Sequence, residues 1–226
     1  TLRAAAPWQT LRRRAAPQRT GLIHVQGDDL RISRLQQRAA TATIFVLDAS
    51  GSSALHRLGE AKGAINLLLA DCYVRRDQVA VIAFRGRSAE LLLPPTRSLV
   101  RAKRSLAALP GGGGTPLALG LEAALRLATQ VRRSGATPIV VLLTDGRANI
   151  TRAGEPGRAQ AEADAIAMAR QLRAARLTAL VVDTSPQPAI AAQRLAAEMA
   201  AQYRALPYAG AQALTAAVQA LPRKVN

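Results

Sequence analysis

Apolar residues follow two alternating patterns from residue 41 onward. Short runs rich in Val, Ile and Leu are typical of strands buried on both faces of a parallel sheet. Between these runs, apolar residues recur at the spacing of an amphipathic helix. The runs predict strands at 43–47, 78–84, 89–93, 137–143, 178–182 and 203–206, and the helical spacing predicts helices at 54–73, 98–108, 116–133, 157–176, 188–201 and 211–221.

This alternation indicates an α/β domain over residues 41–226 with right-handed crossover connections. We expect a doubly wound, mostly parallel open sheet of Rossmann type, with about six strands and helices on both faces. Pro94 and Pro95 end the third strand, so an antiparallel edge position suits it. Cys72 falls on the apolar face of the helix at 54–73, and we expect it to be a core residue rather than a nucleophile.

Residues 1–40 have the composition of a basic arm rather than of a domain. Pro7 and Pro17 disfavour a long helix, and the apolar residues flanking 26–29 suggest a small hairpin. Two interpretations stay open: a docking segment for a neighbouring subunit, or a linker that packs Trp8 on the main domain. Because the chain opens on Thr1 rather than on Met, we also expect it to be a piece of a longer polypeptide.

The net charge of +17 bears on which partners are plausible. Residues 1–40 carry +6 of it, and a second concentration of basic residues lies at 75–104. Such a field favours acidic protein surfaces or nucleic acid. Nucleic acid is disfavoured because there are only six aromatic residues, and none is interleaved with the basic runs. A general bias of composition toward Arg and Ala is the alternative explanation.

Cysteine content and hydropathy describe the expected surroundings. A single cysteine excludes an internal disulfide and fits a reducing compartment. No apolar run approaches the ~18 residues of a membrane-spanning helix, and no signal-peptide pattern is present. We therefore expect no membrane span in this chain, and targeting information could lie upstream of Thr1.

Oxygen-bearing side chains gather where the apolar runs end. Asp48 follows the first strand, and Ser50 and Ser52 alternate with it, so the three side chains can converge. Asp145 follows the strand at 137–143. If this strand is the neighbour of the first, the two strands lie about 4.8 Å apart and both carboxylates face one crevice. Open α/β sheets bind ligands at this end, and such oxygens suit Mg²⁺ or Mn²⁺. The alternative is that Asp48 and the serines only cap the next helix.

Four glycines at 111–114 precede Thr115 and Pro116. They do not form a phosphate loop, because no Lys follows at Walker spacing and Pro116 occupies the place of the third glycine of GxGxxG. Thr115 therefore stands at a helix entrance, where its hydroxyl can cap the helix or bind a cation. Asp183 also ends a strand, but the Thr-Ser-Pro that follows it is typical of a turn, so we leave Asp183 outside the site.

Taken together, Asp48, Ser50, Ser52, Thr115 and Asp145 resemble the metal-ion-dependent adhesion site of von Willebrand factor A, or integrin I, domains. The resemblance implies that the three hydroxyls coordinate the metal and that the two aspartates bind it directly or through water. The wider sequence is similar to the carboxyl-terminal region of the magnesium chelatase D subunit family. The segments that carry this second resemblance are 61–64, 70–79, 83–86, 92–98, 111–114 and 143–149.

The resemblance to the D subunits implies further parts and partners. Upstream, it implies an AAA-like domain and an acidic, proline-rich linker. It implies ATP-dependent insertion of Mg²⁺ into protoporphyrin IX for (bacterio)chlorophyll synthesis, together with a hexameric ATPase I subunit and a porphyrin-binding H subunit. The resemblance also implies that ATP is used by the complex, and we do not expect this chain to bind it. The implied location is the bacterial cytoplasm, or the chloroplast stroma in a plant or alga.

Two carboxylates and three hydroxyls leave a position open on a divalent cation that takes six ligands. We expect a carboxylate of the I or H subunit to fill it, so that the chain is a docking module. No general base or nucleophile stands beside the site, so we do not expect catalysis by this chain alone. The arginines expected to steer the acidic partner are Arg85, Arg87, Arg97, Arg101 and Arg147.

Other readings remain open at this point. One is a generic adhesion or scaffold module of the von Willebrand factor A type, and another is a basic nucleic-acid-binding module. A nucleotide-binding enzyme would need the phosphate loop that the sequence lacks. Delivery of the bound ion itself to the porphyrin is disfavoured, because its release would dismantle the docking site.

Overall fold

The computed structural model describes residues 2–18, 21, 23–30, 40–50, 69, 70, 72, 74, 77–107, 111–205 and 216. The chain divides into two compact units, residues 1–38 and 39–226. Most of the helix expected at 54–73, and all but one residue of the helix expected at 211–221, lie outside the described residues.

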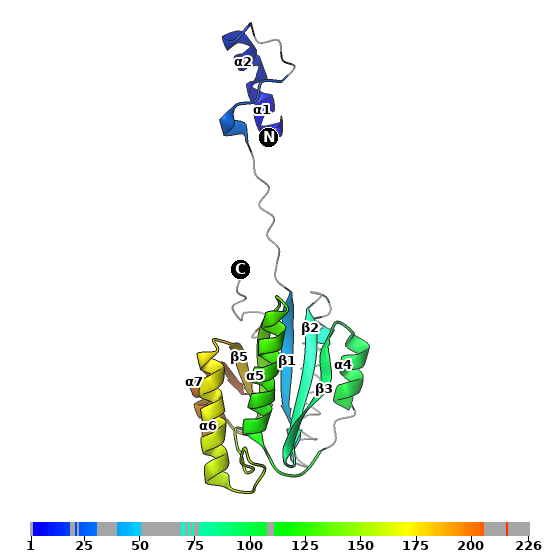
Figure 1. Cartoon of the computed structure of the whole chain (residues 1–226), viewed down its shortest axis with the longest axis vertical. Helices are drawn as coiled ribbons and strands as arrows, with labels where there is room; N and C mark the ends of the chain where they lie inside the picture. The colour runs from blue at the N-terminus through cyan, green and yellow to red at the C-terminus, as the bar shows by residue number, and fades with distance from the viewer. Residues whose placement is uncertain are drawn as a thin grey trace. The chain divides into compact units, whose positions relative to one another are not determined.

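The second unit is built on a six-stranded sheet with the strand order β3-β2-β1-β4-β5-β6 (Figure 1). Neighbouring strands are parallel except β2 and β3, which are antiparallel and place β3 at the edge. The predicted sheet, including its antiparallel edge strand, is therefore confirmed. The strands are β1 (Thr41–Asp48), β2 (Gln78–Arg85), β3 (Ser88–Thr96), β4 (Thr137–Thr144), β5 (Thr178–Asp183) and β6 (Gln202–Ala205).

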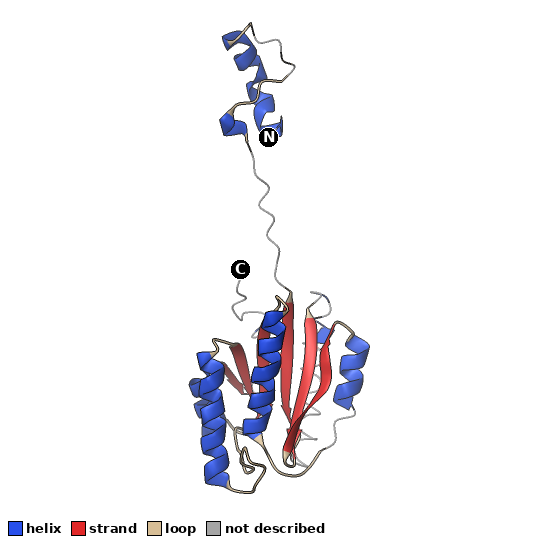
Figure 2. Ribbon diagram, viewed as in Figure 1, coloured by secondary structure: helices blue, strands red, loops and turns tan. Residues whose placement is uncertain are grey.

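Helices pack on both faces of this sheet (Figure 2), as the sequence predicts. One core joins the sheet to α5, α6 and α7, and the core on the other face includes residues of α4. None of the helices in the described ranges is long and apolar enough to cross a bilayer. The helices are α4 (Leu99–Ala107), α5 (Leu117–Arg133), α6 (Arg158–Ala174) and α7 (Ile190–Met199).

The continuous apolar character of β1 follows from burial on both faces. Ile44 and Val46 belong to one core, whereas Phe45 and Leu47 belong to the other. Cys72 is fully buried, with its Sγ 3.7 Å from Thr43 Oγ1, so its predicted place in the core is confirmed.

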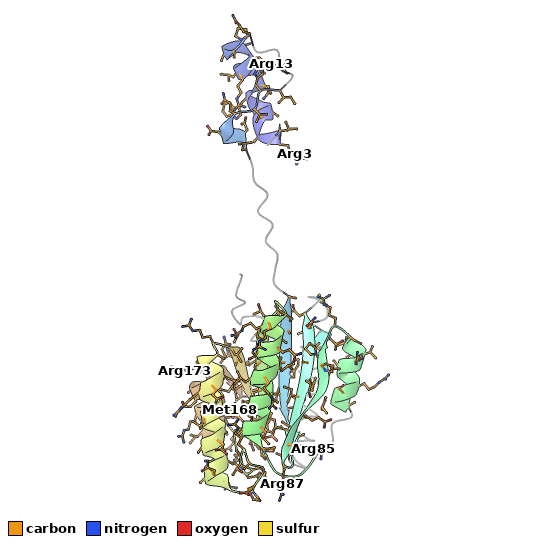
Figure 3. All side chains as sticks on the ribbon, in the orientation of Figure 1. Arg3, Arg13, Arg85, Arg87, Met168 and Arg173 are labelled. Atoms are coloured by element: carbon orange, nitrogen blue, oxygen red, sulfur yellow. The ribbon has the colours of Figure 1, made fainter. Side chains whose placement is uncertain are left out.

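The helices show the opposite distribution of side chains. On α6, Met168 is buried in the core, whereas Arg173 is exposed on the outside (Figure 3). This one-sided pattern is what the helical spacing of apolar residues predicts for a helix packed on a sheet.

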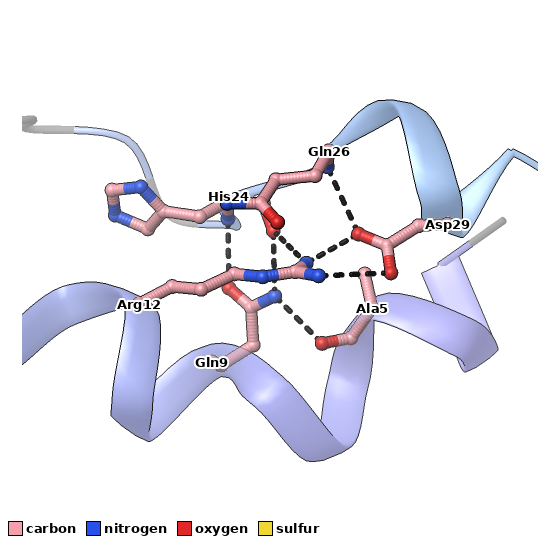
Figure 4. Close-up of polar contacts among 6 residues, drawn as sticks. All are labelled: Ala5, Gln9, Arg12, His24, Gln26 and Asp29. Atoms are coloured by element: carbon pink, nitrogen blue, oxygen red, sulfur yellow. Dashed lines mark hydrogen bonds and ion pairs between the residues drawn. The ribbon is translucent and has the colours of Figure 1, made fainter. Parts of the chain in front are cut away.

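The first unit consists of short helical segments held by polar contacts (Figure 4). The Arg12 guanidinium pairs with the buried Asp29 carboxylate and also donates to the His24 carbonyl. Gln9 Nε2 donates to the His24 carbonyl at 2.8 Å, and its Oε1 accepts from the His24 N–H at 2.7 Å. The segments are α1 (Leu2–Ala5), η1 (Ala6–Trp8), α2 (Gln9–Ala15) and η2 (Gly27–Asp29).

The hairpin expected around residues 26–29 lies partly outside the described residues, because Leu22, Arg31 and Ile32 of its flanking segments are not described; the described residues 23–30 form no strand. A 3-10 turn forms there instead, because the Asp29 carboxylate accepts from the Gln26 N–H at 2.9 Å and is held in place by Arg12. An Asp at this position satisfies the first amide of the turn, which favours a capped turn over a strand reversal.

Candidate metal site

Asp48 lies at the carboxyl end of the central strand β1, between β2 and β4. Its Oδ1 accepts from the Ser50 N–H at 3.0 Å and from Ser50 Oγ at 2.6 Å. Its Oδ2 accepts from Thr144 Oγ1 at 3.1 Å. The carboxylate is therefore held by two hydroxyl groups and one amide, in the loop where the sequence places the candidate site.

Thr115 joins this group from a distant part of the chain. Its Oγ1 donates to Ser50 Oγ at 2.8 Å, which completes a hydrogen-bonded line from Thr115 through Ser50 and Asp48 to Thr144. The helix α5 begins just beyond Thr115 with Pro116 as its N-cap residue and no side-chain cap, and Thr115 Oγ1 donates to Ser50 instead. Of the two roles left open for this hydroxyl, capping is thus not observed.

Asp145 follows Thr144 directly and brings a second carboxylate to the same edge. Its Oδ1 accepts from the Arg147 N–H at 3.0 Å. Burial is the main cause that raises the pKa of Asp48, and the negative charge of Asp145 adds to it. Of the five predicted site residues, four are therefore brought together, and the fifth, Ser52, lies outside the described residues.

The electrostatics of Asp48 fit a bound cation. Burial raises the pKa of Asp48 to about 6; the hydrogen bonds from Ser50 oppose this shift, and the charge of Asp145 adds to it. A divalent cation would relieve both causes of the shift, since it neutralises the two carboxylates together. Carboxylate and hydroxyl oxygens are hard ligands, and they fit Mg²⁺ or Mn²⁺ better than a soft metal.

The described part of the chain offers no metal cluster built from His, Cys, Asp and Glu alone. No three His, Cys, Asp or Glu side chains come together there as a metal cluster. A cation at the Asp48 edge would therefore depend on the hydroxyls of Ser50 and Thr115 as well as on the two carboxylates.

Sequence reasoning missed two residues that support the site. Thr144 is fully buried; it donates to Asp48 and its Oγ1 accepts from the Gly146 N–H at 3.1 Å, so it couples the two aspartate loops. Asn149 Oδ1 accepts from the Thr115 N–H at 2.6 Å. Thr144 could have been suspected from its place beside Asp145, whereas no local pattern marks Asn149.

The glycine loop positions Thr115 by close packing. A Cβ at Gly114 would lie 2.4 Å from Ile150 Cγ1 and 2.9 Å from the Gly86 carbonyl oxygen. The Gly112 N–H also donates to the Ala49 carbonyl at 2.9 Å. Glycine is therefore needed so that this loop can lie between the β2–β3 turn and the loop after β4.

The loop after β4 is itself braced against two helices. Arg152 Nε donates to Glu122 Oε2 on α5 at 3.0 Å, and the Arg152 N–H donates to Asp164 Oδ2 on α6 at 2.8 Å. The same loop contains Asn149 and Ile150, whose N–H groups donate to the Thr115 carbonyl. This bracing fixes the distance between Thr115 and the aspartate loop.

The five arginines expected around the site are divided between the carboxyl ends and the amino ends of the parallel strands. Arg85 and Arg87 lie at the carboxyl end of β2 and in the turn after it (Figure 3), and Arg147 follows Asp145. The strand β3 then runs back, so that Thr96 pairs with Val79 at the amino end of β2. We call the side of the sheet where β1 and β4 end, at Asp48 and Asp145, the metal edge. Arg97, next in the chain, and Arg101, in the first turn of α4, therefore do not lie at the metal edge.

The fold and the matched residues define the class of this domain. A family model described as von Willebrand factor type A domain matches residues 43–147, a range that includes Asp48, Thr115 and Asp145. A solved structure with the same fold is the von Willebrand factor domain of the type V pili tip protein Mfa5 from Porphyromonas gingivalis. It has a TM-score of 0.62 at 13% identity and covers 81% of this chain and 95% of that one. The second unit therefore has the von Willebrand factor A-like, Rossmann-type fold that the sequence predicts.

Relatives with much higher sequence identity are subunits of magnesium chelatase. The chain is 56% identical over 218 residues to the magnesium-chelatase 60 kDa subunit from Cereibacter sphaeroides, covering 95% of this chain and 38% of the relative. It is 41% identical over 230 residues to the 67 kDa subunit from Chlorobaculum parvum, covering 96% and 37%. The resemblance to these subunits is confirmed, and the chain spans less than two fifths of their length.

Proposed function

We propose that this chain is a metal-dependent protein-docking domain of a magnesium chelatase of the D-subunit type. In this proposal the chain takes part in ATP-dependent insertion of Mg²⁺ into protoporphyrin IX for (bacterio)chlorophyll synthesis. The inserted Mg²⁺ is substrate and is distinct from the ion held at the Asp48 edge. The chelatase relatives support the assignment, and the whole enzyme's activity is carried to this chain from them.

The observation that carries the docking role is the hydrogen-bonded line from Thr115 to Thr144 beside a second carboxylate. In the proposal, Ser50 and Thr115 turn hydroxyl oxygens toward the cation, and Asp48 and Asp145 supply the negative charge. Ser52 joins them by the adhesion-site resemblance. When bound, the cation supplies an electron-poor position that accepts a carboxylate from another protein.

The partner follows from the same chemistry. A carboxylate of the ATPase I subunit or of the porphyrin-binding H subunit fills the open position. Arg85, Arg87 and Arg147 surround it with positive charge, which attracts an acidic surface and speeds encounter. In the proposal the chain contributes assembly rather than turnover, and ATP is hydrolysed elsewhere in the complex.

The test is binding of this chain to purified I and H subunits, measured with Mg²⁺ and with EDTA. We expect the affinity for at least one subunit to fall about tenfold or more in EDTA and in Asp48→Ala. Glu162→Ala is the matched control, because Glu162 is an exposed acid on α6. Its affinity should equal that of the wild type.

Two outcomes would count against the proposal. Binding that is unchanged both by EDTA and by Asp48→Ala would show that the aspartate edge is not the dock. Salt-sensitive binding of duplex or single-stranded DNA that survives EDTA would instead favour the nucleic-acid alternative, since phosphate contacts by arginine need no metal.

A further inference from the structure

The loop between β5 and α7 presents apolar side chains to solvent at the metal edge of the sheet. We call Pro186, Pro188 and Ile190 the ledge. All three are exposed, and Ile190, the first residue of α7, is 82% exposed. An isoleucine in this position contributes little to the core, so its apolar surface is available to another molecule.

The ledge is held in one conformation by a buried carboxylate. Asp183 is fully buried and accepts from the Ser185 N–H at 2.8 Å and from the Ala189 N–H at 2.7 Å. Tyr203 Oη on β6 donates to the same carboxylate at 2.7 Å. Both ends of the loop are thus fixed to one group, and a preformed surface loses less conformational entropy on binding.

The ledge is joined directly to the metal site. Gly146, the residue after Asp145, lies so close to α7 that a Cβ there would be 2.3 Å from the Ala192 nitrogen. The Thr184 N–H donates to the Thr144 carbonyl at 3.1 Å, which ties the start of the loop to the end of β4. The first turn of α7 therefore continues the surface that the aspartate loop begins.

Charge completes the description of this surface. Arg147, the residue that follows Gly146, is exposed and carries a positive charge next to the aspartate loop. The positive charge of Arg147 therefore favours an acidic side chain of the partner. The ledge favours an apolar side chain at the adjoining position. Both preferences are met by a protein segment with an acidic and an apolar side chain close together.

We propose that the partner segment carries an apolar side chain beside the carboxylate that reaches the metal. That side chain packs on Ile190 and the two prolines of the ledge. This inference rests on the proposed docking function. The metal then selects for a carboxylate, and the ledge selects among the acidic segments that offer one.

The molecule supplies a matched control for Ile190. Val100 is 68% exposed and also lies in the first turn of a helix, α4. That turn follows the end of β3, where Thr96 pairs with Val79 at the opposite edge of the sheet. Replacing Val100 therefore removes a comparable exposed apolar side chain far from the metal edge.

The experiment measures binding of short Gly/Ser peptides displayed on a surface, each carrying one Glu or one Gln and either Leu or Ser beside it. In Mg²⁺, we expect the Glu-Leu peptides to bind the wild-type chain about tenfold more tightly than the Glu-Ser peptides. Val100→Ser should keep this ratio. Ile190→Ser should abolish it and leave binding of the Glu-Ser peptides unchanged.

The results separate the ledge from the docking function. Mg²⁺-dependent binding of Glu peptides without any advantage for Leu, or with an advantage that persists in Ile190→Ser, would overturn the ledge alone. Equal binding of Glu and Gln peptides, or binding unaffected by EDTA, would overturn the docking function and the ledge with it.

Discussion

Two aspartates at one edge of the sheet differ in what surrounds them. Asp48 ends β1 and Asp183 ends β5, and both strands are buried and parallel to β4. Asp183 is fully buried and accepts from two backbone amides and a tyrosine hydroxyl. Asp48 accepts from one amide and two hydroxyls, and burial together with Asp145 raises its pKa to about 6.

This difference in partners suggests a different role for each carboxylate. Backbone amides are donors only, so Asp183 is committed to holding the chain around it. Hydroxyls both donate and accept, so the groups around Asp48 can donate hydrogen bonds and still offer lone pairs to a cation. In the proposed account, the two hydroxyls on Asp48 leave it open to a cation, whereas the two amides on Asp183 make it a structural anchor.

The largest expected effect is on the structural aspartate. Asp183→Ala leaves two amides and a phenol without their acceptor in a buried place, so we expect the free energy of unfolding to fall by about 3 kcal/mol. For a domain of this size the melting temperature should drop by roughly 6 to 12 °C. Thermal unfolding measures it, with Glu162→Ala as an unaffected surface control. A loss as small as that of the control would mean that Asp183 is no anchor.

The next effect comes from the contact between the two regions. Gly146 has φ +77° and faces the backbone of α7, so Gly146→Ala should cost about 2 kcal/mol of stability and should also weaken Mg²⁺ binding by displacing Asp145. Gly135→Ala is the control, because Gly135 has φ +83° but open space around it. It should cost only about 1 kcal/mol. Equal losses in the two variants would show that the packing against α7 is not tight.

The pH dependence of stability tests the electrostatic half of the comparison. In metal-free protein the pKa of Asp48 is raised from 3.8 to about 6, so its contribution to stability is full below about pH 4 and is lost as the pH rises through about 6. Between about pH 5 and pH 7.5 the wild type in EDTA should lose about 1 kcal/mol more than Asp48→Asn. Urea unfolding at both pH values gives this difference, and other titrating groups cancel in it. Parallel profiles would contradict the raised pKa.

The smallest effect concerns steering by the exposed arginines. Arg147→Glu should slow association with the acidic partner about twofold to fivefold at low salt, because it reverses a charge beside the metal edge. Arg133→Glu makes the same change of net charge at the end of α5, where the chain enters the amino end of β4. Stopped-flow association rates should change less in that control. The same slowing in both variants would point to net charge rather than to a local field.

The parts of the site that follow buried strands could be predicted from the sequence. Continuous apolar runs mark parallel strands strongly, so the places of Asp48 and Asp145 at one edge follow from the topology. The hydrogen bonds of Thr144 to Asp48 and of Asn149 to Thr115 could not be predicted in this way. They join residues 96 and 34 positions apart, and they exist only because tertiary packing brings those segments together.

The grouping of the arginines shows a different limit. Arg85 and Arg97 are close in sequence and belong to one basic stretch, yet the antiparallel return of β3 carries Arg97 toward the other edge. Charge along a chain predicts a local field only when the direction of each strand is also known. The turn at Gln26–Asp29 was missed because the ion pair that stabilises it comes from Arg12 in another segment.

The most direct test of the account is calorimetric titration of the chain with Mg²⁺. The wild type should bind one Mg²⁺, and Thr115→Val should weaken that binding about tenfold or more, because it removes the hydroxyl that meets Ser50. Thr129→Val, which removes an exposed hydroxyl on α5, should leave the affinity unchanged. Absence of Mg²⁺ binding by the wild type, or unchanged binding by Thr115→Val, would contradict the claim that hydroxyls and carboxylates at this edge hold a cation.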